Sequence, residues 1–555
     1  MNLEALLSAR LAPALAEVAH AAVDPAVRRS QHADFQSGAV LPLARGLGRS
    51  PRELAEAVTA RADLAGVAHA EVSGPGFVNL TVADELIAAA LTDVAGDARL
   101  GVPQTKQPRT VVLDYSAPNI AKELTVGHLR STVIGDALAR TLEWLGHDVI
   151  RANHVGDWGT AFGMLIEHLL DEGATGVSRA ADLTAFYQAA RAKFDADEDF
   201  RDRARLRVVR LQSGDEETLG LWRSLVAESR RYLLSAYERL GVTLTEADFA
   251  GESGYNDQLA SVVDELDAKG LLVASDGALC VFPEGFTGRD GGPLPLIVRK
   301  SDGGFGYAAT DLAALRHRTR VLGATRLLYV VGAPQRTHFA MVFAVAAAAG
   351  WLPEGVSAEH VPFGSILGTD GRMFRTRSGD SVKLAALLDE AVTRASALAP
   401  DPAVAAAVGV GAIKYADLAG DRRSDYVFDW DRMLALTGNT GPYLQYAYAR
   451  IRSILDRAGA FRPAVRITHP AERALALELL SFEPVVESVA ATLEPHRLAG
   501  YLYGLASLYS TFYEQCPVLK AEDGVRESRL SLCLLTGRTL RRGLDLLGIA
   551  TPAHL

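Results

Sequence analysis

The segment 114–132 holds the residues whose types and spacing are best suited to chemistry. An apolar, β-branched run at 110–113 precedes it, and apolar residues recur at helical spacing from Leu129 to Leu145. A buried strand is therefore expected to lead into a helix that begins near His128. The first N–H groups of that helix and its positive dipole end suit phosphate, Gly127 lets a ligand approach the backbone, and His128 adds a directed donor. A lone histidine at such a junction is more often structural, so this pattern alone leaves both readings open.

Strand and helix signals alternate from about residue 106 to 380, and this alternation predicts an α/β fold with a parallel sheet and crossover helices. Ligands of such Rossmann-type sheets bind beyond the carboxyl ends of the strands. A long insertion, about 172–290, is expected to contain two helices and a hairpin. The expected strands lie at 110–113, 148–153, 326–332 and 360–367, the expected helices at 183–193, 217–240 and 337–350, and the hairpin at 271–282.

The flanking regions differ from this central part. Residues 1–105 predict a small α+β module, which the linker 103–108 separates from the sheet. An alanine-rich stretch within 381–430 predicts connecting helices, and 431–555 predicts an all-helical region. A chain of 555 residues exceeds what one core normally supports, so several domains are expected.

Composition excludes several classes of protein. Cys280, Cys516 and Cys533 have no metal-ligand spacing, which argues against a structural zinc or a disulfide framework and favours a reducing compartment. The apolar stripe that starts at Leu3 is interrupted by charges from Glu4 onward, so it predicts a folded helix and no signal peptide. We therefore expect a cytoplasmic protein without a membrane span.

Charge is distributed unevenly along the chain. The net charge of -10 argues against a nucleic-acid partner, because Lys and Arg dominate binding to phosphates. From residue 431 onward, however, 14 basic and 12 acidic residues give +2, whereas 43 basic and 55 acidic residues upstream give -12. Binding needs only a local basic face. Charge alone fits a nucleic-acid surface and ordinary solvated helix faces equally well.

Several segments together resemble one known family. The run DYSAPNIAKELTVGHLRST at 114–132 resembles the HIGH signature of class I aminoacyl-tRNA synthetases, and specifically that of arginyl-tRNA synthetases. The segments NHVGDWGT (153–160), YAATDLA (307–313), GNTGPYLQY (438–446) and CPVLK (516–520) resemble the same family in the same order. The resemblance implies a Rossmann-type catalytic domain, an α+β N-terminal module that leans on the tRNA elbow and an all-α anticodon-binding domain.

The resemblance implies that arginine reacts with ATP to form an adenylate and is then transferred to tRNA(Arg). Positive charge and N–H dipoles must then meet the crowded phosphates. Two residues depart from the class pattern: Thr125 replaces the first HIGH histidine, and Arg375, in the loop 371–380, replaces the lysine of the KMSKS loop. Lys122 would supply a further charge, although it also fits a solvated loop. The implied catalytic residues are His128, Lys122 and Arg375, and the implied ATP contacts are Thr125, Gly127, His128, His338 and Arg375.

A guanidinium substrate demands carboxylates and planar acceptors. The resemblance implies that Tyr307 and Asp311, one helical turn apart, hold the guanidinium. A helix N-cap is the structural alternative for Asp311, and a turn residue is the alternative for Asn119. The run Gly-Ala-Pro-Gln at 332–335 departs from the expected Asp-Ala-Arg-Gln. The full implied arginine site comprises Asp114, Ser116, Asn119, Tyr307, Asp311 and Gln335.

The expected partners are tRNA(Arg), L-arginine and ATP with its Mg²⁺, without a membrane or a structural zinc, and the protein is expected to be a monomer. The alternative is a paralogue that keeps the fold as a tRNA-independent ligase or as a binding or regulatory module. A complete helical C-terminal region favours the first interpretation, because a free-standing ligase needs no anticodon-reading module. The implied tRNA contacts are Tyr443, Gln445, Arg450, Arg452, Arg538, Arg541 and Arg542.

Overall fold

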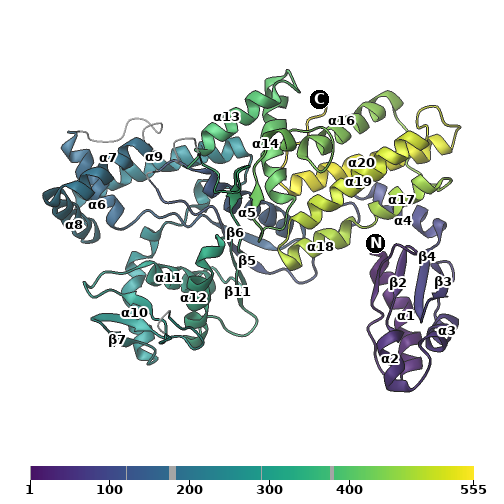
Figure 1. Ribbon diagram of the computed structural model, residues 1–555, viewed down its shortest axis with the longest axis horizontal. Helices are drawn as coiled ribbons and strands as arrows, with labels where there is room; N and C mark the ends of the chain where they lie inside the picture. The colour runs from purple at the N-terminus through teal and green to yellow at the C-terminus, as the bar shows by residue number, and fades with distance from the viewer. Residues whose placement is uncertain (1, 121, 174–182, 289–290, 376–380) are drawn as a thin grey trace.

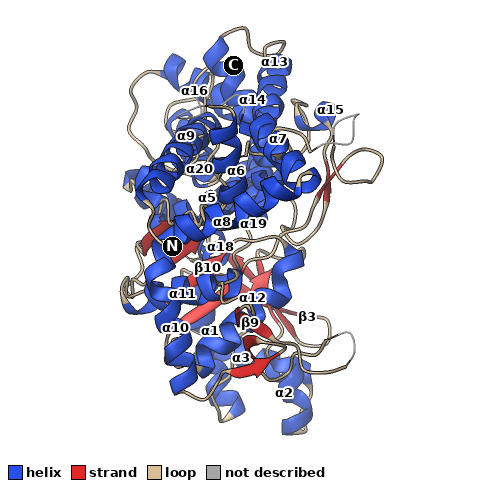
Figure 2. Cartoon of the chain, turned by 90° about the vertical axis from the view of Figure 1, so that its left-hand side faces the viewer, coloured by secondary structure: helices blue, strands red, loops and turns tan. Residues whose placement is uncertain are grey.

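A computed structural model gives the structure of the chain, and it describes all residues except 1, 121, 174–182, 289–290 and 376–380. In Figure 1 the N-terminal module, in purple, lies beneath the yellow C-terminal helices. The helices of the insertion lie at the opposite, left-hand end, and the central sheet lies between the two. Figure 2 shows that helices fill the upper part of the molecule, where the C-terminal half of the chain is found.

The N-terminal module is a four-stranded antiparallel sheet with helices packed against it. The expected apolar stripe of the first helix is buried, with Leu7 and Leu11 at 0% exposure, and Asn2 caps the helix through Ala5 N–H. The strand order is β1-β2-β4-β3. The elements are α1 (Leu3–Ala19), β1 (Val27–Arg29), β2 (Phe35–Ser37), α2 (Val40–Leu47), α3 (Pro51–Arg61), β3 (Ala68–Ser73), β4 (Phe77–Val82) and α4 (Asp84–Gly96).

The central sheet contains four parallel strands in the order β11-β10-β5-β6. One of its two inner strands, β5 (Thr110–Asp114), carries Val111, Val112 and Leu113 at no more than 1% exposure, as its continuous apolar run predicts. The other strands are β6 (Asp148–Ala152), β10 (Arg326–Tyr329) and β11 (Ser357–His360). The strand expected at 360–367 was wrong: the sheet strand ends at His360, and β12 (Ile366–Leu367) pairs separately with β13 (Tyr426–Val427).

Helix α5 (Val126–Trp144) crosses from β5 to β6 and is buried on most of its surface. It packs against the sheet on one side and against helices of the C-terminal half on the other. Two further helices, α11 (Tyr307–Arg320) and α12 (Arg336–Ala348), flank β10, and the second agrees with the helix expected at 337–350.

The insertion is largely helical, as predicted. Its long helix α9 (Glu216–Leu240) starts at the cap residue Asp215 and ends at Gly241, whose φ of 63° suits glycine. The predicted hairpin is present, and the third strand β9, which pairs with β8, was not predicted. The remaining elements between β6 and α11, of which α6 and β9 lie outside the expected bounds 172–290, are α6 (Thr160–Asp171), α7 (Leu183–Ala196), α8 (Glu198–Gln212), η2 (Glu246–Asp248), η3 (Glu252–Tyr255), α10 (Asn256–Ala268), β7 (Val273–Ser275), β8 (Ala278–Val281) and β9 (Leu296–Arg299).

The C-terminal half is helical, as expected, and the N-terminal module is fixed to it. Arg473 donates to Asp34 at 2.7 Å and to Asp84 at 2.7 Å, so one guanidinium joins the two regions. The helices are α13 (Leu384–Ala395), α14 (Pro402–Leu418), α15 (Trp430–Met433), α16 (Gly441–Ala458), α17 (Pro470–Leu479), α18 (Phe482–Thr492), α19 (His496–Gln515) and α20 (Val525–Leu546), preceded by the short η4 (Ala333–Gln335) in the sheet domain.

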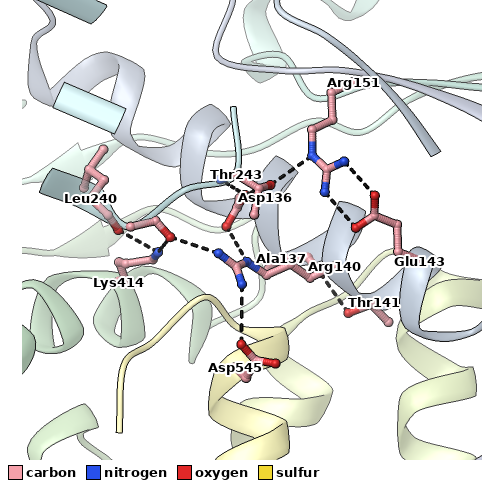
Figure 3. A network of polar contacts seen from close by, with 11 residues as sticks. Asp136, Ala137, Arg140, Thr141, Glu143, Arg151, Leu240, Thr243, Lys414 and Asp545 are labelled. Atoms are coloured by element: carbon pink, nitrogen blue, oxygen red, sulfur yellow. Dashed lines mark hydrogen bonds and ion pairs between the residues drawn. The ribbon is translucent and has the colours of Figure 1, made fainter. Parts of the chain in front are cut away.

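A buried charged cluster joins the sheet domain to these helices (Figure 3). Asp136 on α5 accepts from Arg140 Nε at 2.8 Å and from Thr243 N–H at 2.7 Å. Lys414 on α14 donates to the Leu240 carbonyl at the end of α9, at 2.9 Å. Arg140 also lies 3.5 Å from Asp545 of α20. Four helices, α5, α9, α14 and α20, therefore meet at one joint.

Candidate active site

The start of α5 fixes the orientation of His128. Its Nδ1 accepts a hydrogen bond from Thr125 N–H at 3.1 Å, and the Thr125 hydroxyl lies 3.2 Å from the same nitrogen. Burial lowers the pKa of His128, so the ring is neutral near pH 7 and carries its proton on Nε2. The ring is thus held as a donor on the side that faces away from the helix start. Thr125, an implied ATP contact, is the N-cap residue of α5, and its hydroxyl supports His128.

The helix start is open to a ligand at Gly127. A Cβ there would meet only the Thr125 hydroxyl, at 3.5 Å, and Gly127 is exposed. The segment after the basic loop pairs with this helix start, because Val126 N–H donates to Val382 O at 2.9 Å. Arg375 is exposed and lines a cavity of about 1010 Å³ beside α15. The rest of the predicted basic loop, 376–380, lies outside the described residues.

Lys122 lies shortly before the start of α5, but its side chain points toward α7 of the insertion. Its Nζ lies 3.9 Å from the centre of the Tyr187 ring on α7. A cation on an aromatic face contributes roughly 0.5–2 kcal/mol. This is small enough for a bound phosphate to draw the Lys122 side chain away from the ring. The alternative of a purely solvated loop lysine does not fit this contact.

Three carboxylates gather beyond the strand ends: Asp157 after β6, Glu252 on η3 and Asp311 on α11. Asp157 accepts from Ser253 N–H at 2.8 Å and from its hydroxyl at 2.7 Å. Burial, with the negative charges of Asp311 and Asp157, raises the pKa of Glu252 to about 8. In the described part of the chain the Glu252 carboxylate has no hydrogen-bond or ion-pair partner. Within the described residues, therefore, no cation neutralises the Glu252 carboxylate.

Histidines line the same cluster. His338 Nε2 lies 2.6 Å from Asp311 Oδ2, and His154 Nε2 lies 4.0 Å from Asp311 Oδ1. Burial lowers the pKa of His154, so this ring adds no full positive charge. Gly306, not Asp311, is the N-cap residue of α11, so the N-cap alternative for Asp311 is wrong. His338 therefore contacts the acid cluster, although the family resemblance implied an ATP contact.

The other predicted arginine contacts divide into exposed and buried groups. Tyr307 is 72% exposed at the start of α11, and Gln335 is exposed at the end of η4. Asn119 is exposed and lies over Gly156, where a Cβ would approach its Oδ1 to 2.2 Å. That close packing joins the loops that follow β5 and β6. All three residues are exposed and therefore accessible to a ligand at the strand ends.

Asp114 and Ser116 are buried beneath the site, at 5% exposure each, so their positions do not fit direct arginine contacts. Asp114 forms an ion pair with the buried Arg318 at 2.7 Å. The Ser116 hydroxyl lies 2.8 Å from the hydroxyl of Tyr237. Through these contacts, both side chains stabilise the loop after β5.

Most of the predicted tRNA contacts have partners inside the protein. Gln445 is 0% exposed and donates to the carbonyls of Ala407 and Ala550, so its position does not fit a tRNA contact. Arg538 donates to the Ala95 carbonyl at 2.7 Å and thereby fixes α4 to α20. Arg542 lies 4.0 Å over the Trp144 ring and pairs with Asp545.

The other four lie nearer the surface. Arg450 is exposed and stacks 4.3 Å over Tyr513. Arg452 forms an exposed ion pair with Asp456, and the Tyr443 hydroxyl lies 3.3 Å from Ser510 Oγ. Arg541 is exposed, and among the described residues it has no ion pair or side-chain hydrogen bond.

Known proteins match this chain across its whole length. Residues 90–430 match the family model described as the catalytic domain of class I (R) tRNA synthetases. The chain belongs to the arginyl-tRNA synthetase family. Residues 444–555 match the DALR anticodon binding domain, and residues 1–82 match the N-terminal domain of this family. The boundaries expected near 105, 380 and 430 stay predictions.

Relatives of the arginyl-tRNA synthetase family extend the match. An arginine–tRNA ligase of Thermobifida fusca is 58% identical over 96% of this chain and 95% of its own. The arginyl-tRNA synthetase of Plasmodium falciparum has a similar structure, with a TM-score of 0.86 at 27% identity, covering 100% of this chain and 99% of that one. That of Thermus thermophilus gives 0.84 at 27% identity, with 100% of both chains covered.

The described residues contain no group of three or more His, Cys, Asp and Glu side chains arranged to hold a metal ion. No described helix is long and apolar enough to cross a membrane. Glu252 is not predicted from the sequence, because its short Gly-Glu-Ser-Gly context in the insertion carries no periodic signal. Its one indication is Asp157, within the family segment 153–160.

Proposed function

We propose that this chain activates L-arginine with ATP and transfers it to tRNA(Arg). The observation that carries the proposal is the half-buried Glu252 carboxylate, which lies near Asp311 and has no cationic partner within the described residues. The start of α5, which suits phosphate, follows the central strand β5. Family membership supports the same reaction. The cluster has the charge that a guanidinium needs, and the helix start has the dipole that a nucleotide needs.

The guanidinium is proposed to lie between Glu252 and Asp311. Its five donors require several acceptors, and two carboxylates supply paired, charge-assisted hydrogen bonds. Tyr307, one turn before Asp311 on α11, is exposed enough to close over the substrate. Asn119 and Gln335 are proposed to hold the main-chain end of arginine, since both are exposed near the strand ends.

Adenylate formation joins a carboxylate oxygen of arginine to the α-phosphorus of ATP and breaks the bond from that phosphorus to the β-phosphate oxygen. Pyrophosphate leaves with the electron pair, accompanied by the Mg²⁺ that ATP brings. The neutral His128 is proposed to donate its Nε2–H to a phosphate oxygen in the transition state, and Gly127 to leave room for the nucleotide. Arg375 and Lys122 are proposed to bring positive charge to the phosphates.

In the transfer step, the 2′-hydroxyl of the terminal adenosine attacks the arginyl carbonyl carbon, and the bond from that carbon to the phosphate oxygen breaks. AMP leaves with the electron pair, and the hydroxyl proton passes to solvent. Exposed side chains on α16, α19 and α20 are proposed to contact the tRNA. Tyr446 is 44% exposed on the same helix as Arg450, and aromatic rings with arginines suit unstacked bases and phosphates. We propose that residues 431–555 read the anticodon and that residues 1–105 contact the tRNA elbow.

We further propose that the protein is a cytoplasmic monomer. A tRNA-independent paralogue or binding module would differ from it in one testable respect, because it would not attach arginine to tRNA. Relatives match this chain over both its catalytic and its C-terminal region, and this gives the paralogue no support. Incorporation of labelled arginine into unfractionated tRNA, with the other amino acids as controls, tests substrate and partner together. Adenylate formation without any tRNA charging would favour the paralogue.

His128→Ala tests the proposed chemistry at the helix start. Loss of one oriented transition-state donor should slow arginine-dependent ATP–pyrophosphate exchange about 10²- to 10³-fold. The KM for arginine should stay close to that of the wild type, because His128 is not among its proposed contacts. Exchange within threefold of the wild type would show that His128 only caps the helix.

A further inference from the structure

The loop after β5 has an unusual backbone conformation. Ser116 has a φ of 67° and Ala117 a φ of 44°, so two consecutive non-glycine residues are left-handed. Such conformations cost free energy and persist only where the surrounding structure holds them. This turn directs the chain toward Asn119, Lys122 and the start of α5, all of which belong to the proposed site.

Buried hydrogen bonds hold the turn. Ser116 N–H donates to Ser131 Oγ at 2.9 Å, and Ala117 N–H donates to Asn153 Oδ1 at 3.0 Å. Tyr237 connects these two sides. Asn153 Nδ2 donates to the Tyr237 hydroxyl at 3.0 Å, which leaves the proton of that hydroxyl for Ser116 Oγ at 2.8 Å. One phenol therefore links the loop after β5 to the loop after β6.

Tyr237 lies on α9, which supports these loops at other points as well. Tyr232 accepts from Leu124 N–H at 3.1 Å, and Trp222 Nε1 donates to the Asp157 carbonyl at 2.7 Å. The C-terminal end of α9 is itself fixed, because Lys414 and Arg140 donate to the carbonyls of Leu240 and Gly241 (Figure 3). Helix α9 thus connects the charged joint at its C-terminal end to the loops of the site.

We propose that Tyr237 is a positioning residue for adenylate formation, and that its hydroxyl holds the left-handed turn at Ser116 and Ala117. It is 0% exposed and touches no substrate, so it acts through Ser116 and Asn153. The inference rests on the proposed function. Burial raises the pKa of Tyr237 to about 12, so the hydroxyl stays protonated and available as a donor through the working pH range.

Tyr237→Phe removes the hydroxyl without changing the shape of the side chain. It leaves Asn153 Nδ2 without its partner, and the turn loses one restraint. We expect kcat for arginine-dependent pyrophosphate exchange to fall about tenfold or more, while the melting temperature falls by only a few degrees. Tyr501→Phe is the matched control, because Tyr501 is 6% exposed and donates to the Glu478 carbonyl far from the site. Its exchange kinetics should stay within twofold of the wild type.

Ala117→Gly separates positioning from general stability. Glycine adopts a φ of 44° without steric cost, so the turn needs less support. Tyr237→Phe should therefore lower kcat less in the Ala117→Gly background than in the wild type, and this non-additivity identifies the turn as the coupled element. Equal losses in both backgrounds, or exchange by Tyr237→Phe within twofold of the wild type, would overturn the proposal.

Hydrogen exchange gives a readout that does not depend on the reaction. Amides of the peptide 114–124 should exchange faster in Tyr237→Phe than in the wild type, while those of α16 should not change. If the wild type shows no arginine-dependent exchange reaction even with tRNA(Arg) present, the proposed function fails, and this amide measurement still decides whether Tyr237 holds the turn. Unchanged protection of 114–124 would contradict the role of Tyr237 whatever the substrate.

Discussion

Two groups of largely buried carboxylic acids differ in whether their negative charge has a cationic partner. We call the charge of the first group matched and that of the second unmatched. At the joint, Asp136 lies between Arg140 and Thr243 with Lys414 nearby, and these partners lower its pKa despite burial. At the strand ends, Glu252 lies beside Asp311 and Asp157, and burial with their charges raises its pKa to about 8. Matched charge fixes one helix to another. Unmatched charge leaves a place for a ligand of opposite sign.

The largest effect should come from breaking the matched group. Lys414→Met removes the buried cation beside Asp136 and the hydrogen bond to the end of α9. Breaking a buried charge pair costs about 3–5 kcal/mol, so the melting temperature should fall by several degrees. Arg10→Met is the matched control, because Arg10 pairs with Asp63 on the surface and such pairs contribute about 1 kcal/mol or less. Equal melting temperatures for the two variants would show that the joint adds no stability.

The next effect concerns the acids at the strand ends. Asp311→Asn removes charge opposite the guanidinium without changing shape, and one charge-assisted hydrogen bond contributes about 1.5–3 kcal/mol. The KM for arginine should rise about ten- to a hundredfold, and the KM for ATP should not change. Glu265→Gln is the control, because the charge of Glu265 already has partners inside the protein. Its hydrogen bonds, above all the one from Arg320, hold its pKa at about 2. Equal losses for arginine and ATP in Asp311→Asn would indicate a disturbed fold.

The raised pKa of Glu252 makes arginine binding depend on pH. Below pH 8 the free acid is protonated, and the guanidinium favours the carboxylate, so binding must release a proton. Arginine should therefore bind about tenfold more tightly per pH unit from 6 to 8, and Glu252→Gln should abolish this slope. Without arginine the raised pKa has the opposite consequence: the contribution of Glu252 to stability is complete below pH 4.5 and is lost as the pH rises to about 8. A wild-type slope that persists in Glu252→Gln would assign the proton to another group.

The sequence predicted the parts of the fold that local patterns encode. The buried β5, the start of α5 and the hairpin β7–β8 follow from apolar runs and turn residues within one segment. The strand expected at 360–367 failed because β11 already ends at His360, and the only apolar residues of this span that form a strand, Ile366 and Leu367, pair with β13 instead. Strand β9 was missed because its register depends on β8, its neighbour in space. Pairing between distant segments leaves little trace in a local pattern.

Prediction of the site had the same limit. His128 and Asp311 lie in family segments, and the structure brings both to the strand ends. Ser116 and Gln445 carry the same polar groups as a ligand contact, but their partners, Tyr237 and the carbonyls of Ala407 and Ala550, come from other parts of the chain. A sequence shows which groups need partners, and only the fold shows which of them have found one.

The smallest effects should separate matched from unmatched arginines on α20. Arg538 is bound to the Ala95 carbonyl, whereas Arg541 is exposed and has no ion pair or side-chain hydrogen bond within the described residues. Arg541→Gln should raise the KM for tRNA severalfold and lower the slope of log K against log salt by about one, the effect of one lost phosphate contact. Arg538→Gln should leave that slope unchanged and reduce stability by about 1 kcal/mol, because a hydrogen bond between the N-terminal module and α20 is lost. If the salt slope falls in Arg538→Gln and not in Arg541→Gln, internal pairing is no guide to which arginines of this helix meet the tRNA.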